Sequence, residues 1–198
     1  MIAILDYGSG NLHSAARAFA QAHSDIRITA DPELIASADG VVVPGVGAFG
    51  ACMAQFRSAG VEAALRERLS LGKAIFGICV GMQIFFTHGS EKAGAEGLGI
   101  WPGSVDLLPA PILPHMGWNT VSAGAGSRLF AGVENSSFYF VHSYAAHAEV
   151  PGAINTWGNY GGKFLAAVER DNLVTTQFHP EKSGSAGAHI IKNWVATL

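Results

Sequence analysis

The first eighty residues alternate short apolar segments with segments whose apolar residues recur at helical spacing, and this alternation limits the fold more than any other feature of the sequence. Short apolar runs without polar interruption indicate strands that are buried on both faces. Such runs predict strands at 2–5, 41–43 and 74–78, and a further strand is expected at 26–29. The helices are expected at 12–19, from Pro32 onward, at 50–58 and at 61–71. This order predicts an α/β fold, with an open, mostly parallel sheet and helices on both of its faces.

The second half of the chain has a different pattern. Prolines and glycines break residues 97–126 into short pieces, and we expect an antiparallel strand insertion across residues 97–170. Strands are expected at 137–144, 164–169 and 173–178, and a final helix is expected to carry Ala188, Ile191, Trp194, Val195 and Leu198 on one apolar face. Because no repeat, low-complexity segment or linker interrupts the chain, residues 1–198 are expected to form one domain.

Composition excludes several classes of protein. Apolar residues make up 49% of the chain and charged residues 14%, which favours a compact globular protein over a disordered one. A net charge of −3 without a basic run argues against binding to nucleic acid or to an acidic membrane surface. No apolar stretch is long enough to cross a bilayer, the N-terminus lacks a basic export signal, and two cysteines are too few for a disulfide framework. We therefore expect a cytoplasmic protein without a bound metal.

Cys79 lies where an apolar strand pattern changes to a helical one, in the sequence Gly77-Ile78-Cys79-Val80-Gly81. This G-x-C-x-G pattern is similar to the nucleophile elbow G-x-S-x-G, in which a sharp turn between strand and helix exposes the nucleophile. A helix N-terminus favours the thiolate, and the amide of Val80 would face a developing oxyanion. For this motif alone, packing of a buried cysteine is the alternative to catalysis. Cys52, in a helical pattern without a neighbouring base, is expected to be structural.

His179 and Glu181 follow the last expected strand. Residues two apart in an extended chain share a face, so Glu181 would orient the ring of His179. His179 would act as the general base toward the thiol and then as the general acid toward a leaving amine. A plain surface turn is the alternative interpretation of this segment alone.

Residues 44–50 (PGVGAFG) follow the strand at 41–43, and their glycines let backbone amides approach a ligand and complete an oxyanion hole. A plain glycine-rich loop is the alternative, and the absence of GK[ST] excludes a P-loop. The carboxyl ends of parallel strands meet at one edge of a sheet. There the three segments together would supply a nucleophile, a base, an orienting carboxylate and oxyanion donors. The sequence therefore predicts a cysteine hydrolase site.

At this point the motifs resemble those of a known family. GICVGMQ (77–83) and FHPEKSG (178–184) resemble the nucleophile and histidine–glutamate motifs of the triad, or class I, glutamine amidotransferases. These enzymes hydrolyse the side-chain amide of glutamine through a thioester and pass the ammonia to a synthase. The chain is similar, from Ile2 to the last helix, to one branch of them, the glutaminase subunits of imidazole glycerol phosphate synthases. The motifs of this branch are DYGSGN (6–11), PGVGAFG (44–50), GLGIWPGSV (97–105), PHMGWN (114–119) and FYFVHSY (138–144).

This resemblance implies roles for individual residues. Cys79 would be the nucleophile, His179 the base and Glu181 its orienting carboxylate. In this branch, the peptide before Val46 is expected to turn toward the site only when the partner subunit is occupied. The positions that match the oxyanion hole are Val46, Gly47 and Val80, and those that match contacts to glutamine are Gly47, Gln83, Ser143 and Tyr144.

The resemblance also implies a partner and no cofactor. The partner would be a TIM-barrel cyclase that forms a heterodimer with this chain and uses the ammonia to make imidazole glycerol phosphate and AICAR in histidine biosynthesis. The aromatic and apolar residues of PHMGWN suit a covered surface, although a turn in the core is the alternative. The residues expected to face the partner are Asn11, Met116, Trp118, Asn119 and Lys182.

Other functions remain open at this stage. The acceptor of the ammonia could be another synthase, such as one that makes anthranilate, guanylate or pyridoxal phosphate. The chain could also be a non-enzymatic regulator that binds a metabolite, although an intact set of Cys79, His179 and Glu181 argues against decay of the site. A free-standing cysteine hydrolase or a redox-sensing protein would not need DYGSGN or PHMGWN.

Overall fold

The computed structural model describes residues 1–198, and a seven-stranded sheet lies at its centre. Its strands are β1 (Ile2–Leu5), β2 (Ile26–Thr29), β3 (Gly40–Gly45), β4 (Ala74–Cys79), β11 (Ile154–Asn159), β12 (Lys163–Arg170) and β13 (Leu173–Thr176). They follow the order β11-β12-β13-β4-β3-β1-β2, in which the five strands from β13 to β2 are parallel and β11 and β12 are antiparallel. The predicted parallel strands are therefore confirmed.

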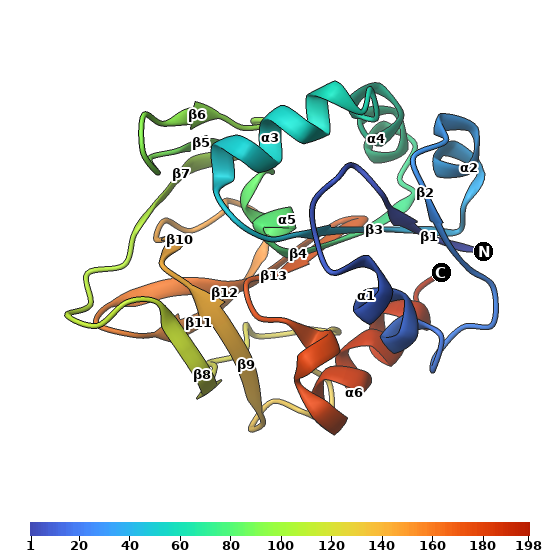
Figure 1. Cartoon of the computed structure of the whole chain (residues 1–198). Coiled ribbons are helices and arrows are strands. Elements are labelled where there is room, and N and C mark those ends of the chain that lie inside the picture. Colours follow the sequence, from blue (N-terminus) through green and yellow to red (C-terminus); the bar gives the residue numbers. More distant parts are fainter.

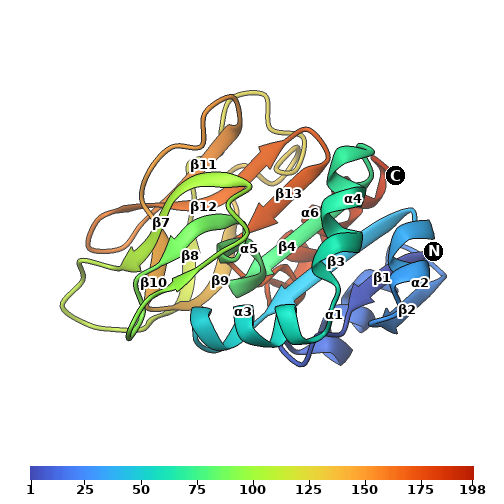
Figure 2. The ribbon, with the colours of Figure 1, turned by 90° about the horizontal axis from the view of Figure 1, so that it is seen from above.

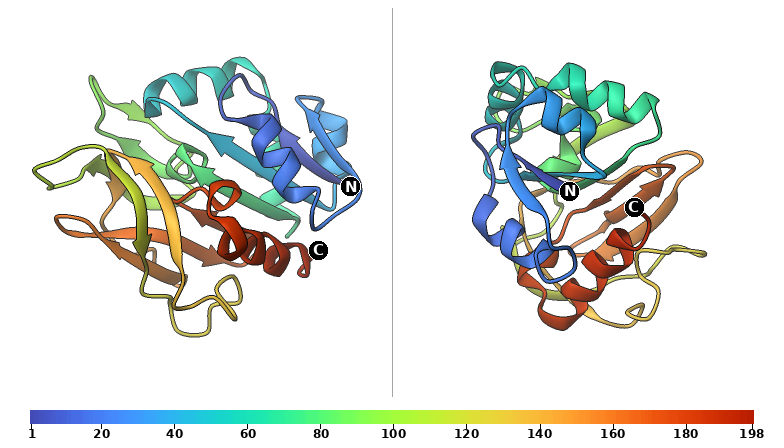
Figure 3. Two further views of the ribbon diagram at one scale, coloured as in Figure 1. Left: turned by 60° about the horizontal axis from the view of Figure 1, so that its bottom comes forward. Right: turned by 90° about the vertical axis from the view of Figure 1, so that its right-hand side faces the viewer.

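Helices cover both faces of this sheet (Figures 1 and 3). One face carries α2 (Pro32–Ser37), α3 (Phe49–Ser58), α4 (Glu62–Ser70) and the single turn α5 (Val80–Gln83), and the other carries α1 (Leu12–Phe19) and α6 (Gly184–Val195). Asp31 caps α2 by accepting a hydrogen bond from the amide of Glu33. Between α1, β4 and α6, the rings of Phe19, Phe76 and Trp194 pack edge-on or tilted against one another. No helix combines the length and the apolar character that a membrane span needs.

Two smaller strand groups lie beyond the carboxyl end of β4 (Figures 1 and 2). The first is a four-stranded sheet, β10-β7-β5-β6, formed by β5 (Phe86–Gly89), β6 (Ala95–Glu96), β7 (Trp101–Leu107) and β10 (Tyr144–Ala146). The second is an antiparallel pair of β8 (His115–Thr120) and β9 (Ser137–His142). These groups confirm an antiparallel strand region in the second half of the chain.

The predicted extent of that insertion, residues 97–170, is wrong at its end. β11 and β12 do not belong to the insertion but extend the central sheet beyond β13 as antiparallel strands. The middle of β12 is fully buried, which is the pattern of a strand covered on both faces. The sequence pattern of a strand can indicate that it is buried, but it does not indicate which sheet the strand joins.

Three predicted element boundaries are also wrong. The strand expected at 137–144 is interrupted at Ser143, because β9 pairs with β8 whereas β10 pairs with β7 in the other sheet. The strand expected at 173–178 leaves the ladder after Thr176. The last helix ends at Val195, so Leu198 lies beyond it and is 41% exposed instead of lying on its buried face. The first two interruptions lie beside the carboxyl ends of β3 and β4, where the expected catalytic segments meet.

Candidate active site

Cys79 ends β4 with a backbone that few residues other than glycine adopt, with φ of +56° and ψ of −113°. Such strain at a turn from strand to helix is typical of a nucleophile held out of the sheet. The neighbouring glycines supply space: a Cβ atom on Gly81 would lie 1.9 Å from the carbonyl oxygen of Val43, and one on Gly77 would lie 2.6 Å from the carbonyl oxygen of Gly81. The G-x-C-x-G pattern therefore allows α5 to pack directly against β3 and β4.

The helix that follows Cys79 is a single turn. α5 contains only the four residues from Val80 to Gln83. A helix macrodipole is the sum of aligned peptide dipoles, so a single turn provides little of the partial charge that we expected to favour a thiolate. The charge at this site must be balanced by side chains instead.

His179 reaches the site from the neighbouring strand. β13 pairs in parallel with β4, and Thr176 lies opposite Ile78, so the chain after Thr176 passes beside Cys79. Nδ1 of His179 lies 2.7 Å from Oε1 of Glu181, and both side chains are almost fully buried. Nε2 of His179 is buried and has no hydrogen-bond partner. The ring therefore has one nitrogen fixed by Glu181 and the other free for proton transfer.

The pairing of His179 with Glu181 is found, but the reason that we gave for it is wrong. Residues Pro180–Lys182 form a 3₁₀ turn and not a continuation of the extended chain. The turn is held by Ser183, whose hydroxyl donates to the carbonyl oxygen of His179 at 2.7 Å and accepts from the amide of Tyr139 at 2.9 Å. The turn, and not strand alternation, brings the Glu181 carboxylate back onto the imidazole.

The environment of His179 favours its charged form. Burial by itself would lower the pKa of His179, but the negative charge of Cys79 and the hydrogen bond and charge of Glu181 outweigh it and raise the pKa to about 10. The second carboxylate oxygen of Glu181, Oε2, is buried and has no hydrogen-bond partner, so this carboxylate bonds to His179 through Oε1. The arrangement suits a thiolate and an imidazolium side by side, which is the active form of a cysteine nucleophile.

The predicted oxyanion donors differ in their availability. Val80 opens α5, and the first amides of a helix have no partner within it. The amide of Val46, in contrast, donates to Oγ of Ser9 at 3.2 Å, and the same hydroxyl donates to the carbonyl oxygen of Val46 at 3.0 Å. Gly47 adopts a φ of +88° with open space around it. Ser9 thus occupies both polar groups of Val46, a contact that sequence reasoning missed.

Gln83 is held by two acceptors at the inner end of the site. Its Nε2 donates to the carbonyl oxygen of Tyr144 at 2.9 Å and to Oε1 of Gln177 at 3.0 Å. Both amide hydrogens are therefore used, and Oε1 is the group that Gln83 can offer to a ligand. Ser143 and Tyr144 reach the same region because the chain changes sheets between β9 and β10.

A chain of hydrogen bonds fixes the backbone of Tyr144 from the other side. Nδ1 of His142 lies 3.0 Å from the carbonyl oxygen of Tyr144, Nε2 of His142 lies 3.1 Å from Nδ1 of His115, and Nε2 of His115 lies 3.3 Å from the side-chain amide of Asn119. Burial lowers the pKa of His142 to about 3 and also lowers the pKa of His115. Because a carbonyl oxygen only accepts, neutral His142 must carry its proton on Nδ1, and His115 must donate to it from Nδ1.

We therefore expect His142 to remain neutral, with its proton on Nδ1, when the pH is lowered from 8 to 5. Its lowered pKa means that the unfolded chain takes up a proton near its ordinary value, whereas the folded chain does so only far below it. Nitrogen-15 NMR of the imidazole rings measures both the charge and the tautomer, and loss of the signal in His142→Gln assigns it. A titration midpoint above pH 5, or a proton on Nε2, would contradict this assignment.

The site opens into a cavity of about 280 Å³. The residues around it include every predicted catalytic and substrate-binding side chain except Glu181, which lies behind His179. Glu91 also lines the cavity, and its Oε2 accepts a hydrogen bond from the amide of Phe49 at 2.9 Å. Glu91 was not predicted as a site residue, because a single acidic residue in a turn belongs to no recognisable sequence motif. No group of three or more histidine, cysteine or carboxylate side chains is arranged to hold a metal ion.

The residues expected to face a partner fall into two groups. Met116 and Trp118 are 65% and 59% exposed on one face of β8, and Lys182 is exposed and lines the cavity. Asn11 caps α1 by accepting from the amide of Ser14, and Asn119 is engaged with His115 and with the carbonyl oxygen of Asn159. The structure therefore gives these two asparagines local structural roles in addition to any contact with a partner.

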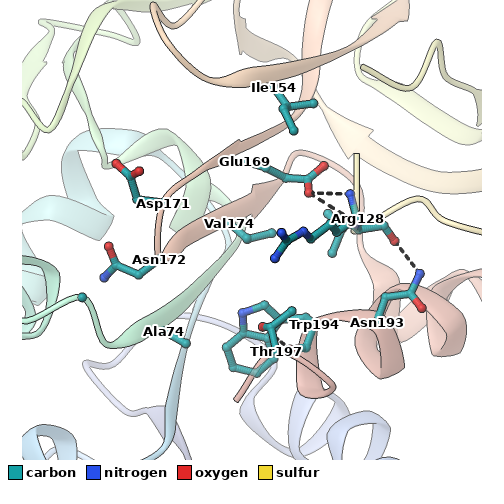
Figure 4. Close-up of a pocket in the computed structure, with 12 residues that line it drawn as sticks. Ala74, Arg128, Ile154, Glu169, Asp171, Asn172, Val174, Asn193, Trp194 and Thr197 are labelled. Carbon is teal, nitrogen blue, oxygen red and sulfur yellow. Dashed lines mark hydrogen bonds between the residues drawn. The ribbon is translucent and has the colours of Figure 1, made fainter. Parts of the chain in front are cut away.

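A larger cavity of about 620 Å³ lies at the opposite edge of the sheet (Figure 4). It is bounded by the start of β4, the turn between β12 and β13, and α6, and thus lies away from the carboxyl ends of the parallel strands. Two of its polar side chains hold nearby backbone: Glu169 accepts from the amides of Arg128 and Leu129, and Asn193 donates to the carbonyl oxygen of Leu129. Its lining contains no cysteine and no histidine, and we assign the chemistry to the cavity at Cys79.

Comparisons with known proteins agree with this geometry. The family model described as glutamine amidotransferase class-I matches residues 3–198. Imidazole glycerol phosphate synthase subunit HisH of Nocardia farcinica is 55% identical over 206 residues, which cover 100% of this chain and 98% of that protein. The protein of the same name from Mycobacterium tuberculosis strain H37Rv is 52% identical over 201 residues, again with 100% and 98% covered.

A solved structure of a glutamine amidotransferase superposes with a TM-score of 0.78 at 17% identity, covering 100% of this chain and 99% of that one. At this identity the likeness concerns the fold, and it confirms the predicted α/β architecture. The match of the family model over nearly the whole chain and the identity to the two relatives extend the likeness from the fold to the sequence. This chain belongs to the class I glutamine amidotransferases and, among them, to the family of the imidazole glycerol phosphate synthase subunits HisH.

Proposed function

We propose that this chain hydrolyses glutamine to glutamate and ammonia through a thioester on Cys79, and that it delivers the ammonia to a cyclase subunit in histidine biosynthesis. The observation that carries the proposal is the buried pair of His179 and Glu181 beside the strained Cys79. One imidazole nitrogen is fixed by the carboxylate, and the other is free at the nucleophile. This is the arrangement that hydrolysis of an amide by a cysteine requires.

The cavity has the polar groups that glutamine needs. The substrate carries an α-ammonium and an α-carboxylate at one end and a neutral amide at the other. Glu91 supplies a carboxylate for the ammonium, and Oε1 of Gln83 supplies a further acceptor. Ser143 and the amide of Gly47 can donate to the α-carboxylate, so the side-chain amide is directed toward Cys79.

The reaction then follows from the arrangement at Cys79. The thiolate attacks the carbonyl carbon of the side-chain amide, and a tetrahedral oxyanion forms next to the amide of Val80. His179 gives its proton to the nitrogen, so ammonia leaves and a thioester remains on Cys79. A water molecule, deprotonated by His179, attacks the thioester and releases glutamate, which restores the thiolate and the imidazolium.

The Ser9 contact leads to a proposal for the second oxyanion donor. We propose that the peptide at Val46 turns when the partner binds, so that its amide leaves Ser9 and faces the oxyanion. In the structure described here the Val46 amide is bonded to Ser9. The Val46 amide belongs to the peptide that joins Gly45 to Val46. Its hydrogen bond to Ser9 contributes about 0.5–1.5 kcal/mol and favours the orientation in which this peptide faces Ser9.

Replacing Ser9 by alanine should therefore raise ammonia release by the isolated chain, by about two- to tenfold. The reason is that the peptide joining Gly45 to Val46 loses the hydrogen bond that holds its amide in this orientation. Ammonia release from glutamine without a partner subunit measures the effect, and Ser14→Ala on α1 serves as a matched control in the same region. Basal activity at or below that of the unaltered chain would mean that Ser9 does not hold the donor back.

We further propose that Met116 and Trp118 form the surface covered by a TIM-barrel cyclase in a cytoplasmic heterodimer. Their side chains are exposed on the face of β8 opposite to the buried His115. β9, which pairs with β8, leads directly into the cavity at Val141 and Ser143. Ammonia released into water would be protonated and would lose its nucleophilicity, so a covered route from the cavity to the acceptor is required.

A different synthase as the ammonia acceptor is the second candidate. The test is ammonia release by the chain alone, with the cyclase subunit, and with the cyclase and its nucleotide ligand, together with complementation of a histidine auxotroph. Strong activation in the loaded complex supports the proposed function. Activity that does not respond to the cyclase would mean that another synthase accepts the ammonia. Absence of activity in every state would favour a metabolite-binding regulator.

A further inference from the structure

Gln177 is a fully buried amide between the nucleophile and the substrate pocket, and the mechanism above does not use it. Its Nε2 donates to Sγ of Cys79 at 3.7 Å, and its Oε1 accepts from Nε2 of Gln83 at 3.0 Å. One side chain therefore touches both the reacting sulfur and the residue that we assign to substrate binding.

The surrounding hydrogen bonds determine which end of the Gln177 amide faces the sulfur. The carbonyl oxygen of Tyr144 only accepts, so the group of Gln83 that meets it must be the NH₂ group. The same NH₂ group meets Gln177, which must present its oxygen there. The NH₂ group of Gln177 is then directed to Cys79, and the sulfur acts as the acceptor.

The backbone places Gln177 and His179 on the same side. The amide of Gln177 still bonds to the carbonyl oxygen of Ala166 on β12, so the chain remains extended beyond the last residue of β13. Residues two apart in an extended segment share a face. Phe178 points the opposite way and stacks on Phe138 with ring centroids 4.3 Å apart. Anchoring of Phe178 in the core thus directs both Gln177 and His179 to Cys79.

We propose that Gln177 is a further catalytic residue, whose Nε2–H group stabilises the thiolate of Cys79 while its Oε1 fixes the amide of Gln83 for substrate. This inference rests on the proposed glutaminase function and deepens it. A buried thiolate needs donors in place of water, and α5 is too short to provide much of that charge stabilisation. The charge of His179 stabilises the thiolate before it attacks, and the Nε2–H group of Gln177 adds a neutral hydrogen-bond donor to the same sulfur.

The test uses two variants of the full chain that separate the two ends of the amide. Gln177→Met removes both the donor and the acceptor at similar volume. Gln177→Glu keeps the acceptor for Gln83 but turns a carboxylate oxygen to the sulfur. Thr175→Val is the matched control. Thr175 lies on β13, two residues before Gln177, is equally buried, and has a hydroxyl without a hydrogen-bond partner.

Two readouts are needed. The first is the pH dependence of alkylation by iodoacetamide, followed at Cys79 by peptide mass spectrometry so that Cys52 is not counted. A hydrogen bond to a charged group is lost in Gln177→Met, so the midpoint should rise by about one pH unit, with alkylation about tenfold slower below it. In Gln177→Glu the midpoint should rise further. The second readout is the steady-state kinetics of ammonia release, in which both variants should lose kcat and only Gln177→Met should also raise KM for glutamine.

A third measurement needs no variant and keeps the inference testable if both substitutions prevent folding. The side-chain amide proton of Gln177 should move downfield in the NMR spectrum across the alkylation midpoint, because a thiolate is the stronger acceptor. Unchanged alkylation profiles in folded variants, or an amide resonance that does not move, would overturn the role of Gln177. Since alkylation reports on the thiol without glutamine, a failure of the glutaminase function would appear separately, as normal alkylation behaviour with no ammonia release in the unaltered chain.

Discussion

Replacement of Cys79 by alanine should abolish ammonia release from glutamine, with a loss of at least about four orders of magnitude in kcat, alone and in complex with the cyclase. In the proposed mechanism the sulfur forms the thioester, and an alanine leaves only binding and oxyanion stabilisation, which cannot replace a nucleophile. Coupled detection of glutamate and ammonia measures the loss. The affinity for the cyclase should stay within about twofold, because Cys79 is buried and Met116 and Trp118, which we propose to face the cyclase, are exposed.

The other cysteine gives a matched control. Cys52 is buried on α3, and its sulfur lies 3.1 Å from the hydroxyl of Tyr7, so its contacts are structural. Cys52→Ala should retain most of the ammonia release and lower the stability, by about 1 kcal/mol for the methylene-sized volume that is removed. Ammonia release above background by Cys79→Ala would contradict the assignment of the nucleophile, and so would loss of ammonia release in both cysteine variants.

Replacement of His179 by alanine should reduce kcat/KM by about three to four orders of magnitude. In the proposed mechanism the imidazole protonates the leaving ammonia and later activates water, and its loss also removes the positive charge beside the sulfur of Cys79. Glu181→Gln should cost less, about ten- to a hundredfold, because the ring remains but its orientation and its charged form are less favoured. Steady-state kinetics of ammonia release measure both variants.

The order of these two effects tests the assigned roles. His189→Ala, on the less buried side of α6, is a control for the loss of an imidazole outside the site. Equal losses in His179→Ala and Glu181→Gln would mean that Glu181 does more than orient and charge the ring. Near-normal kcat/KM in His179→Ala would remove the base from the mechanism altogether.

Much of the candidate site was predictable because its signals are local. Gly77, Cys79 and Gly81 lie within five residues, and the strained turn that they permit depends on their own backbone and on the space beside it. His179 and Glu181 are two residues apart, so any turn between them keeps them within reach of each other. The sequence even placed them correctly when the assumed conformation, an extended chain, was wrong.

Gln177, Ser9 and Glu91 were missed because their partners are remote in the sequence. The amide of Gln83 that meets Gln177 lies 94 residues away, and the Val46 peptide that meets Ser9 lies 37 residues away. A weak signal existed for Gln177, since it precedes His179 by two residues in a segment that we expected to be extended. Nothing in the sequence indicated which of its neighbours its amide would meet.

The sequence by itself determined the parallel sheet, the helices on its two faces, the position of Cys79 at a strand end and the pairing of His179 with Glu181, because apolar periodicity and turn chemistry act over a few residues. Only the tertiary structure decided that β11 and β12 extend the central sheet, that the chain changes sheets at Ser143, and that Ser9 occupies the Val46 peptide. Those features depend on which distant strand or hydroxyl supplies a hydrogen-bond partner. Such choices are made by the packing of the whole chain and leave no local pattern.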